Sequence, residues 1–430
     1  MTQPQKKHIV VIGAGVIGLS SALLLLEQGC YTVTIIAEHF PGPFETIHPQ
    51  EHIDYSSPWA GAHNRFIPPL PSSSSSPPDQ VQSQAEREHV LALRTFSRMK
   101  SLSSGDKDPE AAQFSSVKFM KGVEFLEDPP EAYKALSGPL AAELGYENFR
   151  VLEQHEFPAD GGVKWGCEYQ TWCLNPMVYC CFLLRRFVNR GGRILKRRVR
   201  SVNEVFQLDL PGGDPDWNTH FGSTWLSPKN CANQQQPEEA KEVRRTTHAV
   251  VNASGNGLGD DAAMFITRGQ TCVVAESGTT EEPKTVTRQN ADGTWTFTVP
   301  RGAEGGTVVG GTREPDNYDP LPCPKLRDQL LERIIQTQPG LLAKGKSKLT
   351  PVRDIVGRRP TRRGGPRIEG EILNIDVRKD KKQQGFVMHA YGMGGRGYEL
   401  SWGVAEEVVN GVSEYFLERS GSAPGGVSKL

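Results

Sequence analysis

The 430-residue sequence has no long apolar run, no zinc-type cysteine pair and no excess of charge. A transmembrane helix needs about 18 or more consecutive apolar residues, so no membrane span is expected. Lysine and arginine together number 49 against 50 aspartates and glutamates, so no net field favours nucleic acid or an anionic membrane surface. A first apolar strand is expected from residue 8, which leaves no room before it for a signal peptide.

Cysteine is also sparse for a chain of this length. The sequence holds eight cysteines and no Cys-x-x-Cys pair. This argues against a zinc cluster and against the disulfide scaffold of a secreted protein, and no metal site is expected. Most of the thiols are expected to be buried as small apolar groups. One disulfide between loop cysteines such as Cys231 and Cys272 stays open.

The most informative stretch is the N-terminal run, which predicts a βαβ unit that binds a dinucleotide. A β-branched strand from His8 turns through a glycine-rich segment into a leucine-rich helix, and a second strand begins at Tyr31. The helix N-terminus offers free N–H groups and positive potential to phosphates. A glycine-rich structural turn is the alternative. The predicted cofactor contacts in this unit are Gly13, Ala14, Gly15, Val16, Ile17, Gly18 and Glu38.

Each key position in this unit has a physical reason. Gly13 permits the tight turn, Gly15 lets a pyrophosphate approach the backbone, and Gly18 lets the helix pack closely on the strand. Glu38 follows the second strand, twenty residues past Gly18. Its carboxylate suits ribose hydroxyls and would repel a 2′-phosphate, which favours NAD or FAD over NADP.

Beyond this unit the chain alternates helices, loops and strands. Residues 70–84 are rich in proline and serine and predict a loop, and residues 86–99 have the apolar spacing of a helix. Short strands are expected from residue 117, and Asn175 before Pro176 marks another helix start. Residues 193–195 predict a further strand of the nucleotide-binding domain. The polar segment 208–242 predicts a surface excursion.

The later sequence returns to strand patterns. A buried strand from His248 ends in a second glycine-rich turn, and three further strands follow: residues 271–275, 295–300 and 307–311. They predict an antiparallel sheet in a second domain. The predicted fold class is therefore α/β, with a Rossmann-like nucleotide-binding domain and a mainly antiparallel second domain.

A set of motifs is spread over most of the chain: residues 10–18, 57–62, 251–255, 268–270, 299–301, 310–312, 356–360, 362–367, 389–398 and 401–403. In this order they resemble the D-amino-acid oxidase family, which includes D-aspartate oxidase, in a fungal-type peroxisomal form. The resemblance implies FAD as cofactor. It implies an FAD-binding domain of residues 1–66, 172–266 and 347–430 and a substrate domain of residues 67–171 and 267–346.

The resemblance also implies the reaction. A D-amino acid transfers a hydride from its α-carbon to flavin N5, the imino acid hydrolyses to a 2-oxo acid and ammonia, and dioxygen reoxidises the flavin with release of hydrogen peroxide. No acid–base residue is needed for the C–H step, so catalysis is expected to rest on orientation and electrostatics.

Arg359, before Pro360, occupies the family position that holds the α-carboxylate, where a planar guanidinium binds in bidentate fashion. Without the motif, a surface arginine in a basic run would be the simpler interpretation. Phe297 stands where the family usually has a tyrosine, so a hydroxyl and one hydrogen bond are lost, with a cost of about 1–3 kcal/mol if the partner is charged. Weaker α-carboxylate binding, or compensation elsewhere, is expected.

Arg313, after Gly310-Gly311-Thr312, stands where members acting on neutral substrates often have an aromatic residue. It resembles the D-aspartate oxidase members, in which this arginine faces the side-chain carboxylate of the substrate, so acidic substrates are favoured. The alternative is a strand-end arginine paired with Glu314 in solvent. His63 and Asn64 fall where the family places polar contacts.

The glycine-rich loop from Gly392 and the helix after it are expected to stabilise the anionic reduced flavin. The predicted catalytic residues are Arg359, Arg313, Phe297 and Tyr391, and the predicted substrate contacts are Arg359, Arg313, His63 and Gly395. The further cofactor contacts that the resemblance implies are Ser57, Ala60, Gly61, Ala62, Ser254, Gly255, Arg359, Gly394, Gly395, Gly397, Tyr398 and Glu399.

The terminal tripeptide Ser428-Lys429-Leu430 matches the peroxisomal address, so binding to the import receptor and a place in the peroxisomal matrix are expected. The other expected partners are a D-amino acid and dioxygen. Three alternatives stay open: a broad-specificity oxidase of neutral D-amino acids, a nucleotide- or flavin-carrying protein without this activity, and a glycine- or sarcosine-oxidase-like enzyme, which the Arg359 and Tyr391 motifs fit less well.

Overall fold

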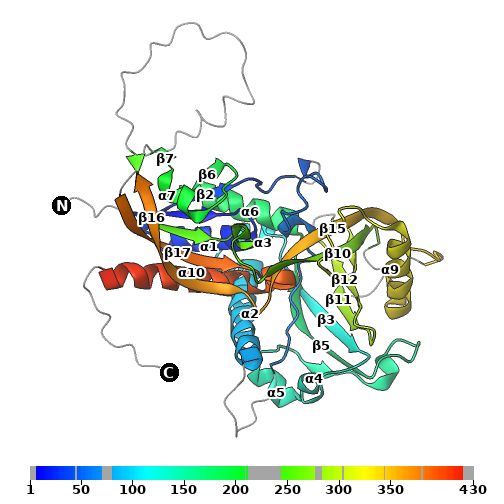
Figure 1. The fold of residues 1–430 in the computed structure, drawn as a ribbon. Coiled ribbons are helices and arrows are strands. Elements are labelled where there is room, and N and C mark those ends of the chain that lie inside the picture. The colour runs from blue at the N-terminus through cyan, green and yellow to red at the C-terminus, as the bar shows by residue number, and fades with distance from the viewer. Residues whose placement is uncertain are drawn as a thin grey trace.

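The computed structural model describes residues 6–43, 46–69, 80–208, 210–211, 244–276, 283–302, 305–342, 344–378 and 381–419. Two large β-sheets lie side by side, and helices cover their faces (Figure 1). Both predicted parts of the fold class, a parallel nucleotide-type sheet and a mainly antiparallel sheet, are present.

The first sheet has six strands, in the order β16-β17-β9-β1-β2-β6. All neighbours are parallel except the edge pair β16–β17. The glycine-rich turn after β1 therefore lies at the same sheet edge as the ends of β2 and β9. The strands are β1 (Lys7–Ile12), β2 (Tyr31–Ala37), β6 (Arg193–Lys196), β9 (Ala249–Asn252), β16 (Arg367–Arg378) and β17 (Lys381–Tyr391).

Alternation along β1 explains the layers around this sheet. Ile9 and Val11 pack with the long helices, whereas Val10 and Ile12 pack on the opposite face with Val205. A strand buried on both faces reads as a continuous apolar run, as this one does. The helices on the first face are α1 (Val16–Glu27), α2 (Gln80–Ser104), α6 (Pro176–Asn189) and α10 (Gly397–Arg419), and α7 (Val202–Gln207) lies on the second.

The second sheet has nine strands, in the order β14-β10-β13-β12-β11-β3-β5-β4, with β15 also paired to β10. The pairings among its described strands are antiparallel apart from β3 beside β11. The strands are β3 (Lys118–Leu126), β4 (Arg150–Val151), β5 (Trp165–Cys173), β10 (Met264–Val274), β11 (Lys284–Gln289), β12 (Trp295–Pro300), β13 (Thr307–Gly310), β14 (Glu314–Pro315) and β15 (Pro351–Arg362).

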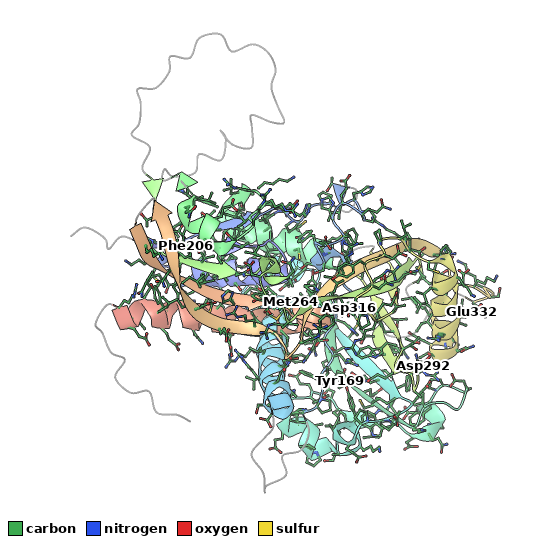
Figure 2. The ribbon with its side chains drawn as sticks, in the orientation of Figure 1. Tyr169, Phe206, Met264, Asp292, Asp316 and Glu332 are labelled. Atoms are coloured by element: carbon green, nitrogen blue, oxygen red, sulfur yellow. The ribbon has the colours of Figure 1, made fainter. Side chains whose placement is uncertain are left out.

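The two faces of this second sheet have different partners. Cys272 and Val309 pack under helix α9 (Pro324–Thr337), whereas Val273 and Val308 face Trp59, which comes from the nucleotide-binding side of the molecule. In Figure 2, Met264 lies between the two sheets and Tyr169 lies well inside the second. Shorter elements complete the fold: α3 (Pro109–Phe114), α4 (Glu131–Lys134), α5 (Gly138–Glu143) and the small β7 (Leu210–Pro211) and β8 (Arg244–Arg245) pair.

Several predicted boundaries need adjustment. The helix predicted over residues 86–99 runs from Gln80 to Ser104, so residues 80–84 are helical rather than loop; residues 70–79 and 212–243 lie outside the described part. The predicted start of α6 is confirmed, since the Asn175 side chain accepts a hydrogen bond from the Met177 N–H at 3.3 Å.

The observed strand pairing also differs from the predicted division into two domains. Strand β15 pairs with β10 in the second sheet, although the boundary at 347 assigned residues 351–362 to the FAD-binding part. The boundaries at 171/172 and 266/267 fall within β5 and β10. Helix α2 packs on α10, where Thr95 Oγ accepts hydrogen bonds from the Trp402 and Gly403 N–H groups at 3.2 and 3.1 Å. Long-range strand pairing, which leaves no local signal, decides these positions.

The cysteines that the structure describes are all free thiols, including Cys272, while Cys231 lies outside the described residues. Cys167, Cys173, Cys180 and Cys272 are buried, but Cys30 and Cys323 are exposed. Among the described helices, none is long and apolar enough to cross a membrane.

Candidate active site

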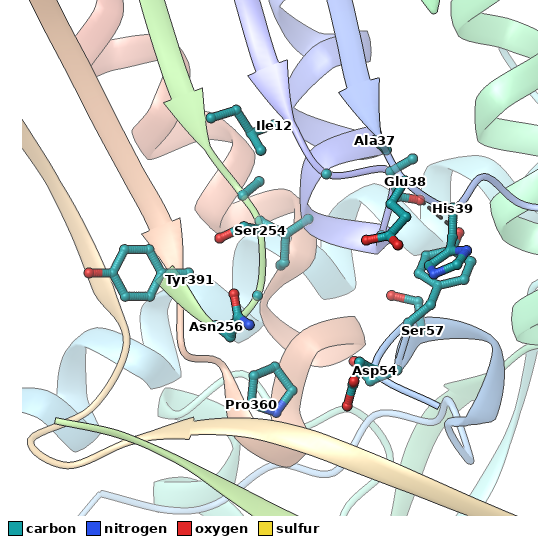
Figure 3. A pocket seen from close by; sticks show the side chains of 18 of the residues that line it. Ile12, Ala37, Glu38, His39, Asp54, Ser57, Ser254, Asn256, Pro360 and Tyr391 are labelled. Atoms are coloured by element: carbon teal, nitrogen blue, oxygen red, sulfur yellow. Dashed lines mark hydrogen bonds between the residues drawn. The ribbon is translucent and has the colours of Figure 1, made fainter. Parts of the chain in front are cut away.

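A cavity of about 600 Å³ opens at the carboxyl ends of the parallel strands of the first sheet. Figure 3 shows Glu38 and His39 at one end of it and Tyr391 at the other. Ligands of open α/β sheets bind at this edge. The predicted residues that line it are Gly13, Ala14, Gly15, Val16, Ile17, Glu38, Ser57, Ser254, Gly255, Tyr391, Gly394 and Gly397.

The first glycine-rich turn has the close approaches that its sequence predicts. Gly13 has a φ of 101°, and a Cβ there would overlap the Ala253 carbonyl. A Cβ on Gly18 would overlap the Gly13 carbonyl oxygen. A Cβ on Gly15 would instead meet only a side chain, with Ser57 Oγ 3.0 Å away. Gly13 and Gly18 are therefore required by close contacts with backbone atoms, whereas Gly15 leaves space beside the helix N-terminus.

Ser57 lies at the N-terminus of α1. Its Oγ accepts a hydrogen bond from the Val16 N–H at 3.0 Å, and its carbonyl accepts one from the Tyr398 hydroxyl at 2.9 Å. Tyr55 donates to the Ala14 carbonyl at 2.8 Å. The segment around Ser57 is thus fixed over the positive end of the helix.

The Phe297 ring of β12 lies against two glycines and against His63. A Cβ on Gly310 would overlap the Phe297 ring, and a Cβ on Gly61 would lie 3.4 Å from it. The His63 ring stacks on Phe297 with centroids 6.1 Å apart and an interplanar angle of 26°. Burial, together with the nearby charge of Arg65, lowers the pKa of His63 to about 3, so these two rings carry no charge at neutral pH.

Arg359 reaches the same region from β15. Its Nη1 donates to the Thr312 carbonyl at 3.1 Å, and within the described residues no carboxylate pairs with its guanidinium. Burial, and then repulsion by Arg313, lowers the pKa of Arg359, while Glu314 opposes the shift. In the described residues, the Arg359 guanidinium therefore keeps donors without an anionic partner.

Arg313 lies in the loop between β13 and β14, exposed and near enough to Arg359 to repel it. The alternative pairing with Glu314 is not observed, because Glu314 binds Arg268 at 2.7 Å. Over the described ranges, Arg313 forms no ion pair. Two guanidinium groups without carboxylate partners thus lie near each other.

Similar proteins show to which family this chain belongs. Residues 8–410 match the family described as FAD dependent oxidoreductase (DAO). The sequence is 36% identical over 414 residues to a D-aspartate oxidase from Talaromyces thermophilus, covering 94% of each chain. It is 29% identical over 409 residues to a D-amino-acid oxidase from Fusarium vanettenii, covering 93% of this chain and 95% of that protein.

The chain belongs to the D-amino-acid oxidase family. It is therefore an FAD-dependent oxidoreductase, and the prediction of the family and of FAD is confirmed.

Solved structures with low sequence identity support the fold. A glycine oxidase from Bacillus cereus aligns with a TM-score of 0.57 at 14% identity, covering 95% of this chain and 98% of that one. An L-proline dehydrogenase from P. horikoshii aligns with a TM-score of 0.58 at 16% identity, covering 98% and 96%. The fold of this D-amino-acid oxidase family member is thus shared with these two proteins.

The cavity fits FAD on the chemistry of its own walls. Gly15 leaves room at the helix N-terminus, where N–H groups and the dipole suit a pyrophosphate. Ser254 Oγ is buried and, in the part of the chain described, has no hydrogen-bond partner, so it can serve a ligand group. Glu38 is exposed at the far end, where a ribose is expected. These residues would hold the cofactor.

Some predicted contacts lie outside the cavity lining. The Tyr398 hydroxyl donates to the carbonyl of Ser57, which does line the cavity. Glu399 accepts a hydrogen bond from Arg396 at 2.7 Å. Their direct contact with FAD stays a prediction, as it does for the others that do not line this cavity: Gly18, Ala60, Gly61, Ala62, Arg359 and Gly395.

Other lining residues were not predicted, notably Tyr55 and residues 197–200. Strand β6 runs parallel to β2, so the residues after it reach the same edge as Glu38, and Arg198 Nε lies 3.6 Å from Glu38 Oε2. The sequence signal was the strand prediction at 193–195, because the carboxyl ends of parallel strands share one edge.

Tyr391, predicted as catalytic, has its ring in the cavity wall but its hydroxyl in an ion-pair network. The hydroxyl donates to Asp261 Oδ2 at 3.0 Å and accepts from Arg367 at 3.2 Å. Asp261 also binds Arg362 at 2.7 Å, and this partner lowers the pKa of Asp261 to about 2. Tyr391 thus fixes the wall, and a catalytic role stays a prediction. In the described residues, no group of three His, Cys, Asp or Glu side chains is arranged to hold a metal ion.

Proposed function

We propose that this D-amino-acid oxidase prefers acidic substrates such as D-aspartate, which it converts with dioxygen and water to a 2-oxo acid, ammonia and hydrogen peroxide. The observation that carries the proposal is the pair of arginines, Arg359 and Arg313, without carboxylate partners in the described residues. A dicarboxylate supplies one anionic group for each.

Arg359 is assigned the α-carboxylate. Its strand position is fixed by pairing with β10, where Arg359 lies opposite Thr267. A guanidinium binds a carboxylate through two parallel hydrogen bonds, which fixes the orientation of the α-carbon as well as its position. FAD, when bound, supplies the acceptor for the hydride of the α-carbon, and the chain supplies the orientation.

Arg313 is assigned the side-chain carboxylate of the substrate. A hydrogen bond to a charged group contributes about 1.5–3 kcal/mol, which corresponds to roughly 10- to 100-fold in affinity. An alanine side chain offers no anion to this exposed cation, so D-alanine is expected to gain none of this binding energy.

Phe297 and His63 are assigned the wall of the pocket. Phe297 offers no hydroxyl to the α-carboxylate, which makes Arg359 the dominant contact. His63 is neutral because burial lowers its pKa to about 3, so it neither attracts nor repels the second carboxylate at neutral pH. A broad-specificity oxidase of neutral D-amino acids is the second candidate, and the apolar Phe297 ring is the observation that favours it.

The test is anaerobic bleaching of the purified yellow protein. D-Aspartate, D-glutamate, D-alanine, D-phenylalanine and L-aspartate are each mixed with the oxidised enzyme, and the decay of flavin absorbance is followed. Faster bleaching at low concentration by D-aspartate than by D-alanine supports the proposal. Equal or faster bleaching by the neutral substrates supports the second candidate, and no bleaching by any D-amino acid excludes both. The peroxisomal location and the import receptor stay predictions.

A further inference from the structure

Arg268 is a buried arginine in the second sheet that the proposed reaction does not use. Its side chain is 3% exposed and lies on β10. Its Nη1 donates to Glu314 Oε1 at 2.7 Å, its Nε to the Asp319 carbonyl at 2.8 Å, and its Nη2 to the Leu321 carbonyl at 2.6 Å. One guanidinium thus holds three points of the segment that follows Arg313.

Glu314, the partner of Arg268, is held on both carboxylate oxygens. Oε1 also accepts a hydrogen bond from Thr312 Oγ1 at 2.6 Å, and Oε2 accepts one from Asn317 Nδ2 at 2.6 Å. None of these donors is Arg313. The acid next to Arg313 in the sequence is therefore engaged elsewhere, although an adjacent aspartate or glutamate is an ordinary partner for an exposed arginine.

We propose that Arg268 is a positioning residue for acidic-substrate selectivity: it holds Glu314 away from Arg313 and so leaves the Arg313 charge for the substrate. The inference rests on the proposed function. Without Arg268, the released Glu314 carboxylate is tethered one residue from Arg313, at an effective concentration that substrate in solution does not reach. It then competes for the guanidinium and repels a second carboxylate.

The loop has a second anchor at Gln270, whose Oε1 also accepts a hydrogen bond from Arg268 Nη2 at 3.4 Å. The Gln270 side chain donates to the Cys323 carbonyl at 2.9 Å and accepts from the Cys323 N–H at 2.8 Å. The Asp316 N–H also donates to the Ile266 carbonyl at 2.8 Å, and Figure 2 places Asp316 beside Met264 at the start of β10. These bonds hold both ends of the loop, so a change at Arg268 is expected to alter the charge pairing more than the path of the chain.

The experiment compares the holoenzymes of wild type, Arg268→Gln, Glu314→Gln and the double variant. The first measurement is the ratio of kcat/KM for D-aspartate to that for D-alanine. The second is the dissociation constant of succinate relative to propionate, the amine-free analogues of the two substrates, from the perturbation of flavin absorbance. Arg288→Gln is the matched control, since Arg288 is also buried and binds two carboxylates, Glu127 and Asp160, within the same sheet.

Arg268→Gln is expected to lower both ratios about tenfold, mainly through KM, while D-alanine turnover changes little. Glu314→Gln alone keeps the wild-type preference, and the double variant recovers it, because no carboxylate remains to compete. A purely structural role predicts the opposite, with the double variant no better than Arg268→Gln. That result, or unchanged ratios in Arg268→Gln, overturns the proposal.

A milder variant covers the case in which Arg268→Gln does not fold. Asn317→Ala removes one bond from Glu314 and is expected to lower the D-aspartate ratio by about two- to threefold, with recovery in Asn317→Ala/Glu314→Gln. An unchanged ratio in Asn317→Ala overturns the proposal in that case. A wild-type enzyme without acidic preference contradicts the proposed function itself, which separates that failure from a failure of Arg268 alone.

Discussion

The guanidinium of Arg359 occupies the space that a β-carbon at position 269 would take: a Cβ on Gly269 would overlap its terminal nitrogens and Cζ. Gly269 lies on β10, which pairs with the strand that carries Arg359. The glycine of the Arg-Gly-Gln motif therefore leaves the space that the Arg359 guanidinium occupies.

Gly269→Ala is expected to displace the Arg359 guanidinium and to raise KM for every D-amino acid substrate about 10-fold or more, because bidentate pairing depends on its position. Steady-state kinetics with D-aspartate and D-alanine measure this effect. Gly138→Ala is the control, since a Cβ on Gly138 meets no atom within 4 Å. Equal KM values in the two variants would show that Gly269 does not support substrate binding.

Arg359 itself is predicted to act on acidic and neutral substrates alike. Arg359→Ala is expected to lower kcat/KM about 10²- to 10³-fold for both D-aspartate and D-alanine, since the α-carboxylate is common to them. Arg359→Lys keeps the charge but not the planar fork, so a smaller loss is expected. Rapid anaerobic flavin reduction measures the chemical step directly. A loss confined to D-aspartate would assign Arg359 to the side-chain carboxylate instead.

Substitutions of Gly18 and Gly15, two of the three glycines of the first turn, are predicted to have different effects. Gly18→Ala would bring its Cβ onto the Gly13 carbonyl oxygen, and loss of folded protein is expected. Gly15→Ala would place its Cβ 3.0 Å from Ser57 Oγ, a side-chain atom, so a folded protein with weakened FAD binding is expected. Thermal unfolding and the ratio of flavin to protein absorbance, with and without added FAD, distinguish the two. Full flavin content in Gly15→Ala would exclude a pyrophosphate at this turn.

His63 is predicted to make stability depend on pH. Burial lowers its pKa to about 3, whereas the unfolded chain takes up the proton near 6.5, so stability is full above about pH 6.5 and is lost as the pH falls toward 3. Between pH 7 and pH 5, wild type is expected to lose roughly 1–2 kcal/mol more than His63→Gln. Urea unfolding at the two pH values measures this. His155→Gln, at an exposed position, should behave as wild type.

The sequence predicts the parts of this molecule whose causes are local. The turn from Gly13 to Gly18 and the Asn175 helix start follow from neighbouring residues, so their positions needed no tertiary information. The place of β15 did not follow, because its pairing with β10 joins residues about ninety positions apart. The ion pair between Arg268 and Glu314 likewise joins residues far apart in the sequence, so it did not follow from the sequence. Arg197 and Arg198 were not predicted to line the cavity. They follow β6, and only the parallel pairing of β6 with β2, which the sequence did not predict, brings them to this site.

The central claim is that Arg313 makes this D-amino-acid oxidase selective for acidic substrates. The most direct measurement is the ratio of kcat/KM for D-aspartate to that for D-alanine in wild type and in Arg313→Gln, from anaerobic flavin reduction. We expect the wild-type ratio to exceed one and to fall roughly 10- to 100-fold in the variant, with little change for D-alanine. A wild-type ratio below one, or a ratio that Arg313→Gln leaves unchanged, would contradict the claim.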